Sequence, residues 1–323
     1  MDINTLAKKL HVLEAIDKSD FQRRARILQS LWREEQGFPP GEHHWKSRSG
    51  EYKSRPLGSR LPMPLAKDTL VNFLTEPIRN LVRSEVCDPP TGSGKLFARP
   101  RIFNDLLSSQ PLCFNLFGEL AFDLPLASTL ISDLTDGRFT EVTSVAFEHS
   151  PGRGDPRYLN DRSAFDVFLQ CRTPSGAPAF IGIEVKYHEN LVGNPGEHKQ
   201  RYDEVADQMG CCVEDRNALQ DAPLQQIWRD HLLAGITRIA DGFEDGLFVM
   251  LYPRDNPHVS DAVAAYRTQL TDQRSFAAWT LENLVGNLRK QSDSQWIDAF
   301  NDRYLAFEKI DLIAHRTSVI FSR

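Results

Sequence analysis

Two carboxylates and a lysine interrupt apolar segments whose alternation is typical of β-strands. Asp166 lies within 164–169, and Glu184 and Lys186 lie within 180–187. Because successive side chains of a strand point to opposite faces, Glu184 and Lys186 share one face and leave apolar side chains on the other. Aligning the apolar faces of the two strands places Asp166 beside Glu184, close enough for both carboxylates to bind one divalent cation.

That pair of carboxylates is suited to the hydrolysis of a phosphodiester. Mg²⁺ takes hard oxygen ligands, typically one or two carboxylates together with water and phosphate oxygens, and Mn²⁺ can substitute for it. The ion activates a water molecule and neutralises charge on the phosphoryl group. Lys186 can orient or deprotonate that water, or stabilise the charge of the transition state.

The Glu-x-Lys pattern alone carries little weight, because the sequence contains it at 51–53, 184–186 and 197–199. Only Glu184 and Lys186 interrupt an apolar strand that has an Asp on the matching face of its neighbour. The alternative is a solvated cross-strand pair of Glu and Lys on a sheet with one exposed face.

A third carboxylate, Glu119, lies in a strongly apolar stretch that predicts a helix over about 109–123. Apolar residues occur nearly all round this helix, which indicates that it is buried. A buried carboxylate must be paired, protonated or bound to a cation, so Glu119 is a candidate third ligand. The alternative is an ion pair with an arginine such as Arg101 or Arg162.

Helices predicted over about 197–208 and 222–240 carry further polar side chains. Arg201 lies on the first helix, and Gln226 and Arg229 lie on the second. Gln226 and Arg229 can face the site and hold a phosphate or the attacking water, and the alternative is ordinary solvation of a helix surface.

The segment 37–66 collects Gly, Pro, Ser and basic residues without periodicity, which predicts a long loop or arm. Trp45 and Tyr52 alternate there with cations, a composition suited to phosphate contact and base stacking. The candidate nucleic-acid contacts in this segment are Lys46, Arg48, Lys53 and Arg55. The charge distribution agrees, since residues 1–100 carry 17 Lys and Arg against 12 Asp and Glu while the whole chain has a net charge of −6.

The order of predicted elements indicates an α/β protein with a central mixed β-sheet flanked by helices. A turn at 173–176 joins two of the first three strands, which form an antiparallel meander. A buried strand at 246–252 follows a long helical crossover and can therefore pair in parallel.

Helices are expected at the N-terminus, one carrying Leu6, Leu10 and Leu13 and another starting with Asp20 as its cap. The three meander strands are predicted at about 141–148, 163–171 and 178–187.

The composition excludes several classes of protein. With 323 residues, 41% of them apolar and 25% charged, the chain has a globular composition. It contains neither an apolar run of membrane-spanning length nor a signal-peptide core, so we expect a cytoplasmic protein without membrane partners.

Its five cysteines form no CxxC pair and predict reduced thiols. The phosphate-loop pattern fails at Gly94-Lys95-Leu96, where Leu replaces Ser or Thr.

These residues resemble the PD-(D/E)XK nuclease superfamily and, more narrowly, a group of bacterial restriction-endonuclease-like proteins of unassigned biological role. The resemblance spans roughly 20–255. It rests on five stretches: Arg33-Glu34-Glu35-Gln36-Gly37, Phe114-Asn115-Leu116-Phe117-Gly118, Asp161-Arg162-Ser163-Ala164-Phe165-Asp166, Ile183-Glu184-Val185-Lys186-Tyr187 and Trp228-Arg229-Asp230-His231.

The resemblance implies a restriction-endonuclease-like core and assigns roles to single residues. Glu119 is implied as the helix carboxylate, Lys186 as the catalytic lysine and Gln226 as the helix glutamine. Asp166 and Glu184 are implied as metal ligands. The Pro that usually precedes the Asp is absent, and Phe165 stands in its place, so the motif is not complete.

We therefore expect a Mg²⁺-dependent nuclease, most simply a DNA endonuclease. The alternatives are an inactive nuclease fold that serves as a nucleic-acid or protein scaffold, and a structural ion-pair network in an unrelated enzyme. A single site cuts one strand, so cutting both strands would imply a homodimer. The expected divisions are a helical N-terminal region with the basic loop, a nuclease-like core, and a C-terminal helical extension packed on the core, at 1–100, 101–255 and 256–323.

Overall fold

The computed structural model describes residues 2–12, 17–193 and 196–313, and these residues form two compact units. The first unit comprises the described parts of 1–80, 98–115 and 294–323, and the second comprises those of 81–97 and 116–293. Both units are discontinuous in sequence, whereas the divisions expected from the sequence are consecutive. The predicted helix position of Leu13 and the last residues of the C-terminal extension lie outside the described residues.

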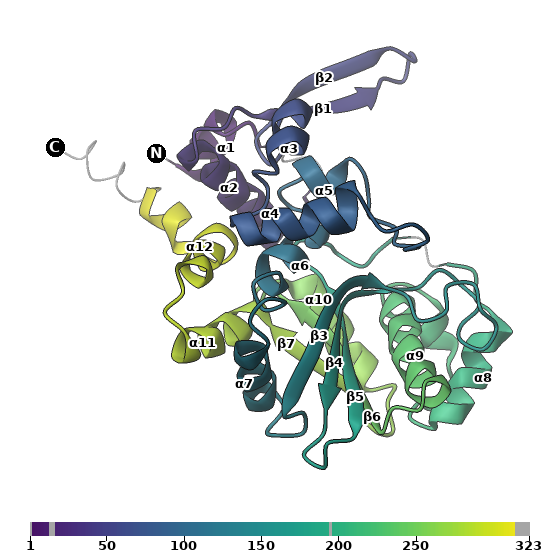
Figure 1. Ribbon diagram of the computed structural model, residues 1–323. Helices are drawn as coiled ribbons and strands as arrows, with labels where there is room; N and C mark the ends of the chain where they lie inside the picture. The colour runs from purple at the N-terminus through teal and green to yellow at the C-terminus, as the bar shows by residue number, and fades with distance from the viewer. Residues whose placement is uncertain (1, 13–16, 194–195, 314–323) are drawn as a thin grey trace. The chain divides into compact units, whose positions relative to one another are not determined.

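Helices form the larger part of the first unit (Figure 1). α2 (Asp20–Glu35) begins after Ser19, whose side chain accepts the N–H of Gln22 at 3.2 Å. Ser19 is therefore the N-cap, and the prediction that Asp20 caps this helix was wrong by one residue. α12 (Gln295–Tyr304) packs against α2. The unit also contains α1 (Ile3–Lys9), α3 (Met63–Thr69) and α5 (Arg101–Asn104).

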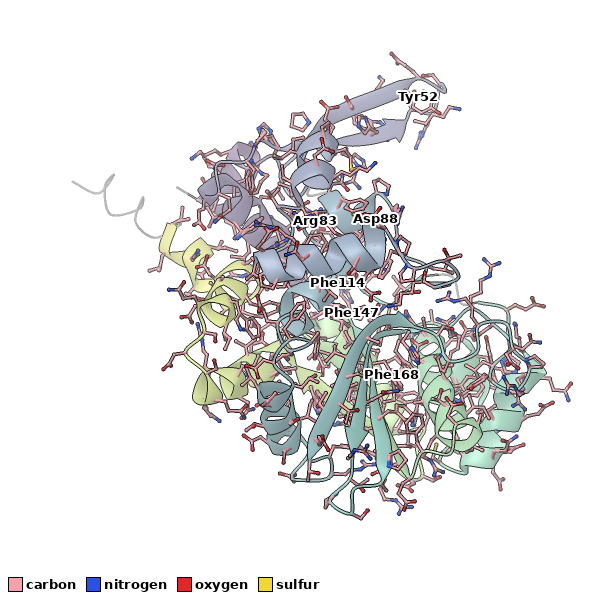
Figure 2. All side chains as sticks on the ribbon, in the orientation of Figure 1. Tyr52, Arg83, Asp88, Phe114, Phe147 and Phe168 are labelled. Atoms are coloured by element: carbon pink, nitrogen blue, oxygen red, sulfur yellow. The ribbon has the colours of Figure 1, made fainter. Side chains whose placement is uncertain are left out.

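A β-hairpin replaces the loop predicted over 37–66. Its strands are β1 (Gly41–Lys46) and β2 (Tyr52–Leu57), which pair antiparallel with Gly41 opposite Leu57 and Lys46 opposite Tyr52. Figure 2 shows Tyr52 on the outer part of this hairpin. Nearly every side chain of both strands is at least partly exposed, so the apolar alternation that reveals a half-buried strand is missing.

The segment 69–86 does not form one continuous helix. α4 (Glu76–Val82) is followed directly by a π-helical turn (Arg83–Cys87). α6 (Ser109–Phe117) covers only the first part of the single helix predicted over 109–123, and the next helix, α7 (Leu124–Leu134), begins after that range. The turn between α6 and α7 begins at Gly118.

The second unit is built on a five-stranded mixed sheet in the order β3-β4-β5-β6-β7. Its first three strands form the predicted antiparallel meander, and β5 pairs in parallel with β6. The sequence prediction of a mixed sheet flanked by helices is confirmed. β7, which pairs in parallel with β6, was not predicted. The strands are β3 (Glu141–His149), β4 (Phe165–Arg172), β5 (Pro178–Val185), β6 (Asp245–Tyr252) and β7 (Phe276–Thr280).

Helices lie on both sides of this sheet (Figure 1). One group consists of α8 (Gln200–Met209), α9 (Leu224–Ala240) and α10 (Pro257–Arg267), and a short 3-10 helix (Asn217–Gln220) precedes α9. These helices bury Tyr202, Trp228 and Tyr266 in one core with Phe168, Phe180 and Phe248 of the sheet. The other group, α7 and α11 (Leu281–Gln291), contacts β3 and β7. No helix of the described residues is long and apolar enough to cross a membrane.

Burial of His231 in α9 makes the stability of the second unit depend on pH. Its Nδ1 lies 2.8 Å from Tyr266 Oη and its Nε2 lies 2.9 Å from Ser275 Oγ. Burial lowers the pKa of His231 to about 4. Because the unfolded chain takes up the proton near pH 6.5, this contribution to stability is complete above that pH and is lost as the pH falls toward 4.

We expect the wild-type protein to lose about 2 kcal/mol of unfolding free energy through His231 between pH 7.5 and pH 5. Urea denaturation at both pH values, with the wild type and with His231→Gln, measures this loss. The variant is expected to be less stable at pH 7.5 but to lose about 2 kcal/mol less on acidification. Equal losses of unfolding free energy in the wild type and in His231→Gln would contradict the role of His231 in the pH dependence.

Candidate active site

β4 and β5 bring Asp166 and Glu184 together in the second unit. The register places Val167 opposite Ile183, which leaves Asp166 next to Glu184 on the adjoining strand. The backbone N–H of Val185 donates to Asp166 Oδ2 at 2.9 Å. This hydrogen bond fixes the Asp166 carboxylate across the strand pair.

Glu184 is the centre of a buried polar group. Its Oε1 accepts hydrogen bonds from Lys186 Nζ at 2.6 Å and from Gln226 Nε2 of α9 at 2.8 Å. The exposed fractions of Glu184 and Lys186 are only 7% and 9%. The alternative of a solvated pair on an exposed sheet face was therefore wrong, because α9 covers this face.

The pKa shifts show how strongly these groups influence one another. Burial and the negative charge of Glu184 raise the pKa of Asp166 well above its usual value. Burial alone would lower the pKa of Lys186, but Glu184, Glu189 and Asp166 outweigh burial and raise it. The Lys186 ammonium group is therefore stabilised by nearby carboxylates, of which Glu184 contacts it directly.

Phe165 occupies the position where the motif usually has a proline. Its ring packs with those of Phe168 and Phe180, with ring centroids 5.7 and 6.3 Å apart. Figure 2 shows Phe168 on the sheet of this unit. A Cβ atom at Gly182 would lie 2.5 Å from the Phe165 ring. The glycine therefore makes room for the residue that precedes Asp166.

Glu119 does not occupy the predicted helical position. α6 ends at Phe117, and Glu119 is half-buried in the turn that follows. Full burial on an apolar helix, the premise for choosing this residue, was wrong, because α6 ends two residues before Glu119. A role for Glu119 in metal binding stays a prediction.

Glu148 is an acidic residue near Asp166 and Glu184 that the sequence reasoning missed. It lies near the end of β3, and Arg153 forms an ion pair with it at 3.1 Å. Burial raises the pKa of Glu148, Arg153 opposes that rise, and Glu184 adds to it. The only sequence signal was an acid at the end of the first meander strand, which fits an exposed strand end equally well.

α9 supplies polar groups from consecutive turns. Gln226 and Asp230 are four residues apart and therefore lie on the same helix face. Asp230 is buried, and burial together with the charge of Glu184 raises its pKa to about 7. Arg229 Nε lies 3.6 Å from Asp230 Oδ1. Asp230 was not assigned a role from the sequence, because a single acid in an amphipathic helix has no distinguishing pattern.

The residues predicted to contact nucleic acid are divided between the two units. Arg201 donates to the backbone oxygens of Tyr158 at 2.7 Å and Arg157 at 3.0 Å, and to Glu204 Oε2 at 3.1 Å. It therefore holds a neighbouring loop, and its contact with nucleic acid stays a prediction. Arg229 belongs to the second unit beside Asp230. The remaining four, Lys46, Arg48, Lys53 and Arg55, lie on the β1–β2 hairpin of the first unit.

The oxygens of the carboxylate pair suit a hard divalent cation. Oδ1 of Asp166 and Oε2 of Glu184 accept no hydrogen bond from the described residues, so both are available as ligands. No group of three His, Cys, Asp or Glu side chains within the described ranges is arranged to hold a metal ion. Two carboxylates completed by water and phosphate oxygens are the coordination typical of Mg²⁺.

Comparison with protein-family models gave a match over residues 15–306, to the model described as the PD-(D/E)XK nuclease superfamily. The match covers most of the chain and includes every residue of the site described above. Searches of curated proteins and of solved structures returned no match.

Proposed function

Because the chain belongs to the PD-(D/E)XK nuclease superfamily, we propose that it is a Mg²⁺-dependent nuclease that hydrolyses phosphodiester bonds of DNA. The observation that carries this proposal is the Glu184 carboxylate, which receives Lys186 and Gln226 on one oxygen and keeps the other available beside Asp166. That arrangement would place two carboxylate oxygens for a metal ion beside the positive charge of Lys186.

Each side chain has a separate task in the proposed reaction. Asp166 Oδ1 and Glu184 Oε2 would hold the ion, which when bound polarises a water molecule and neutralises phosphate charge. Gln226 fixes the orientation of the Glu184 carboxylate through its 2.8 Å hydrogen bond. The Lys186 ammonium group stabilises negative charge that develops on the phosphate oxygens. Arg229 contacts a neighbouring phosphate.

The proposal predicts cleavage that depends on a divalent cation. Supercoiled, linear and branched DNA are incubated with the purified protein in Mg²⁺, in Mn²⁺ and in EDTA. We expect cutting with either metal and none in EDTA, because the carboxylate pair has no other means of polarising a water molecule. Linear product formed directly from supercoiled DNA would indicate a homodimer with two sites.

Glu184→Gln removes one negative ligand oxygen and keeps the shape of the side chain. We expect it to lower the cleavage rate at least about 100-fold, since even outer partners of metal ligands are worth 10-fold to 100-fold. Glu141→Gln, at the exposed start of β3, is the matched control and is expected to cleave like the wild type. Cleavage that persists in EDTA would contradict the metal site. DNA binding without cleavage under any condition would favour the scaffold alternative.

A further inference from the structure

Three of the four cations of the β1–β2 hairpin have no acidic partner among the described residues. Lys46, Arg48 and Arg55 form no ion pair with a carboxylate of the described residues, and Lys53 has only the exposed Glu51 at 3.4 Å. Lys46 instead lies 5.5 Å from the ring of Tyr52, and Arg55 lies 5.5 Å from that of Trp45. The hairpin therefore presents uncompensated positive charge to a partner.

Strand register separates this charge between the two faces of the hairpin. His43 pairs with Arg55 and Trp45 pairs with Lys53, so these four side chains share one face, called here the Trp45 face. The opposite face carries Glu42, His44, Lys46, Tyr52 and Ser54. The strand residues of the Trp45 face include two cations and no acid, although Lys53 is paired with the exposed Glu51 of the turn. The strand residues of the opposite face include one cation, Lys46, and one acid, Glu42.

Aromatic stacking orders the Trp45 face. The rings of His43 and Trp45 are stacked, with centroids 5.6 Å apart and planes inclined by 17°. The Arg55 guanidinium lies over the Trp45 ring, a cation–π contact that restricts a long side chain. The face is therefore an ordered row of ring, ring and guanidinium, although Trp45 is 36% exposed.

The base of the hairpin is firmly attached to the first unit. Gly41 N donates to Arg60 O at 2.7 Å, and Gly58 N donates to His11 O at 3.0 Å. Arg33 Nε donates to Gly58 O at 2.9 Å. A Cβ atom at Gly41 would lie 2.4 Å from Leu61 O, which shows how closely the two backbones approach. The exposed strands thus extend from an anchored base.

We propose that the Trp45 face of this hairpin docks in the major groove of B-form DNA. The inference rests on the proposed function, because it takes a DNA duplex as the substrate. Lys53 and Arg55 contact phosphates and base edges of the groove, and the His43 and Trp45 rings provide the apolar contact between them.

The dimensions of the hairpin fit the major groove of B-form DNA better than its minor groove. Six residues at about 3.4 Å each give strands of roughly 20 Å, longer than the major groove is deep. The major groove of undeformed B-form DNA, about 12 Å wide, admits a two-stranded ribbon, whereas the minor groove, about 6 Å wide, would first have to be widened. The major groove of double-stranded RNA is too narrow for side chains to read. A protein that uses this hairpin for docking should therefore prefer duplex DNA to duplex RNA.

The test measures binding separately from cleavage. Fluorescence anisotropy in EDTA follows the full-length protein on duplex DNA, single-stranded DNA and duplex RNA of one sequence. The informative variants are Trp45→Ala and Arg55→Ala. The controls are His44→Ala, a ring on the opposite face, and Lys67→Ala, an exposed cation of α3 in the same unit.

We expect Trp45→Ala and Arg55→Ala each to weaken duplex DNA binding about tenfold and both controls to bind like the wild type. Arg55→Ala should also reduce the slope of log affinity against log salt concentration by about one, the value for one lost phosphate contact. Dimethyl sulfate should show protection of guanine N7, which lies in the major groove, and not of adenine N3, which lies in the minor groove.

Several outcomes would overturn the inference. The inference would be wrong if both informative variants bound DNA with wild-type affinity, or if the controls lost as much affinity as they do. It would also be wrong if only adenine N3 were protected, or if the protein bound duplex RNA as tightly as duplex DNA. Failure of the proposed function is recognised separately. If the protein binds duplex DNA through the hairpin but never cuts it, the docking inference stands and the proposed nuclease function fails. If variants of the Trp45 face cut DNA like the wild type, the nuclease function stands and the docking inference fails.

Discussion

Replacing Lys186 with methionine is expected to lower the rate of DNA cleavage by about 10²-fold to 10³-fold, the usual effect of removing one group that stabilises transition-state charge. Methionine keeps the apolar stem of the side chain but removes the ammonium group that donates to Glu184 at 2.6 Å. Single-turnover cleavage at saturating protein measures the chemical step, and anisotropy in EDTA shows that DNA binding is retained.

A metal titration separates the two ways in which Lys186 can act. Lys186 lowers the pKa of Asp166, so its loss favours the protonated carboxylic acid, which is a poor metal ligand. If this were its whole contribution, excess Mg²⁺ or a higher pH would restore the rate. We expect a large residual defect at saturating Mg²⁺, because the charge near the phosphate is still missing. Lys290→Met, on the exposed surface of α11, is the control, and a wild-type rate in Lys186→Met would contradict the proposed role.

Arg303→Met is expected to destabilise the first unit by about 3 to 5 kcal/mol, the range for disrupting a buried charged group and its partners. Arg303 of α12 is completely buried. Its guanidinium donates to Asn72 O at 2.7 Å and to Gln29 Oε1 at 3.2 Å, and lies 4.0 Å from the Trp32 ring. The variant leaves buried acceptors without a donor.

Urea denaturation measures this loss, with the two units allowed separate transitions because a two-unit protein need not unfold in one step. The exposed Arg267→Met of α10 is expected to change stability by less than about 0.5 kcal/mol. Arg303→Lys keeps the charge but lacks the planar fork, so its loss should be intermediate. A change below about 1 kcal/mol in Arg303→Met would contradict the importance of these buried contacts.

The sheet could be predicted from the sequence because its strands are half-buried or buried and are bounded by clear turns. The alternation around Asp166 and Glu184 distinguished two faces, and the turn at 173–176 defined the hairpin between β4 and β5. The parallel pairing of β6 followed from the long helical crossover that precedes it. These signals are local and depend on the period of a strand.

The remaining features depend on contacts that no local pattern records. The β1–β2 hairpin has almost no apolar alternation, because its strands are exposed on both faces. β7 has only five residues and lies between helices. Glu148 and Asp230 approach Glu184 from β3 and α9, elements that are distant from it in sequence, so only the tertiary structure brings their charges together.

The attachment of α12 to α2 has a consequence for the order in which the chain folds during synthesis. Gln29 and Arg303, which hydrogen-bond to each other, are 274 residues apart. At about 5 to 20 residues per second, translation separates their appearance by roughly 14 to 55 seconds. Throughout that interval the α2 surface that receives α12 has no intramolecular partner, while the strands of the mixed sheet emerge and can pair. The N-terminal helices are therefore synthesised first, but the packing of α2 is completed only when α12 emerges, near the end of synthesis.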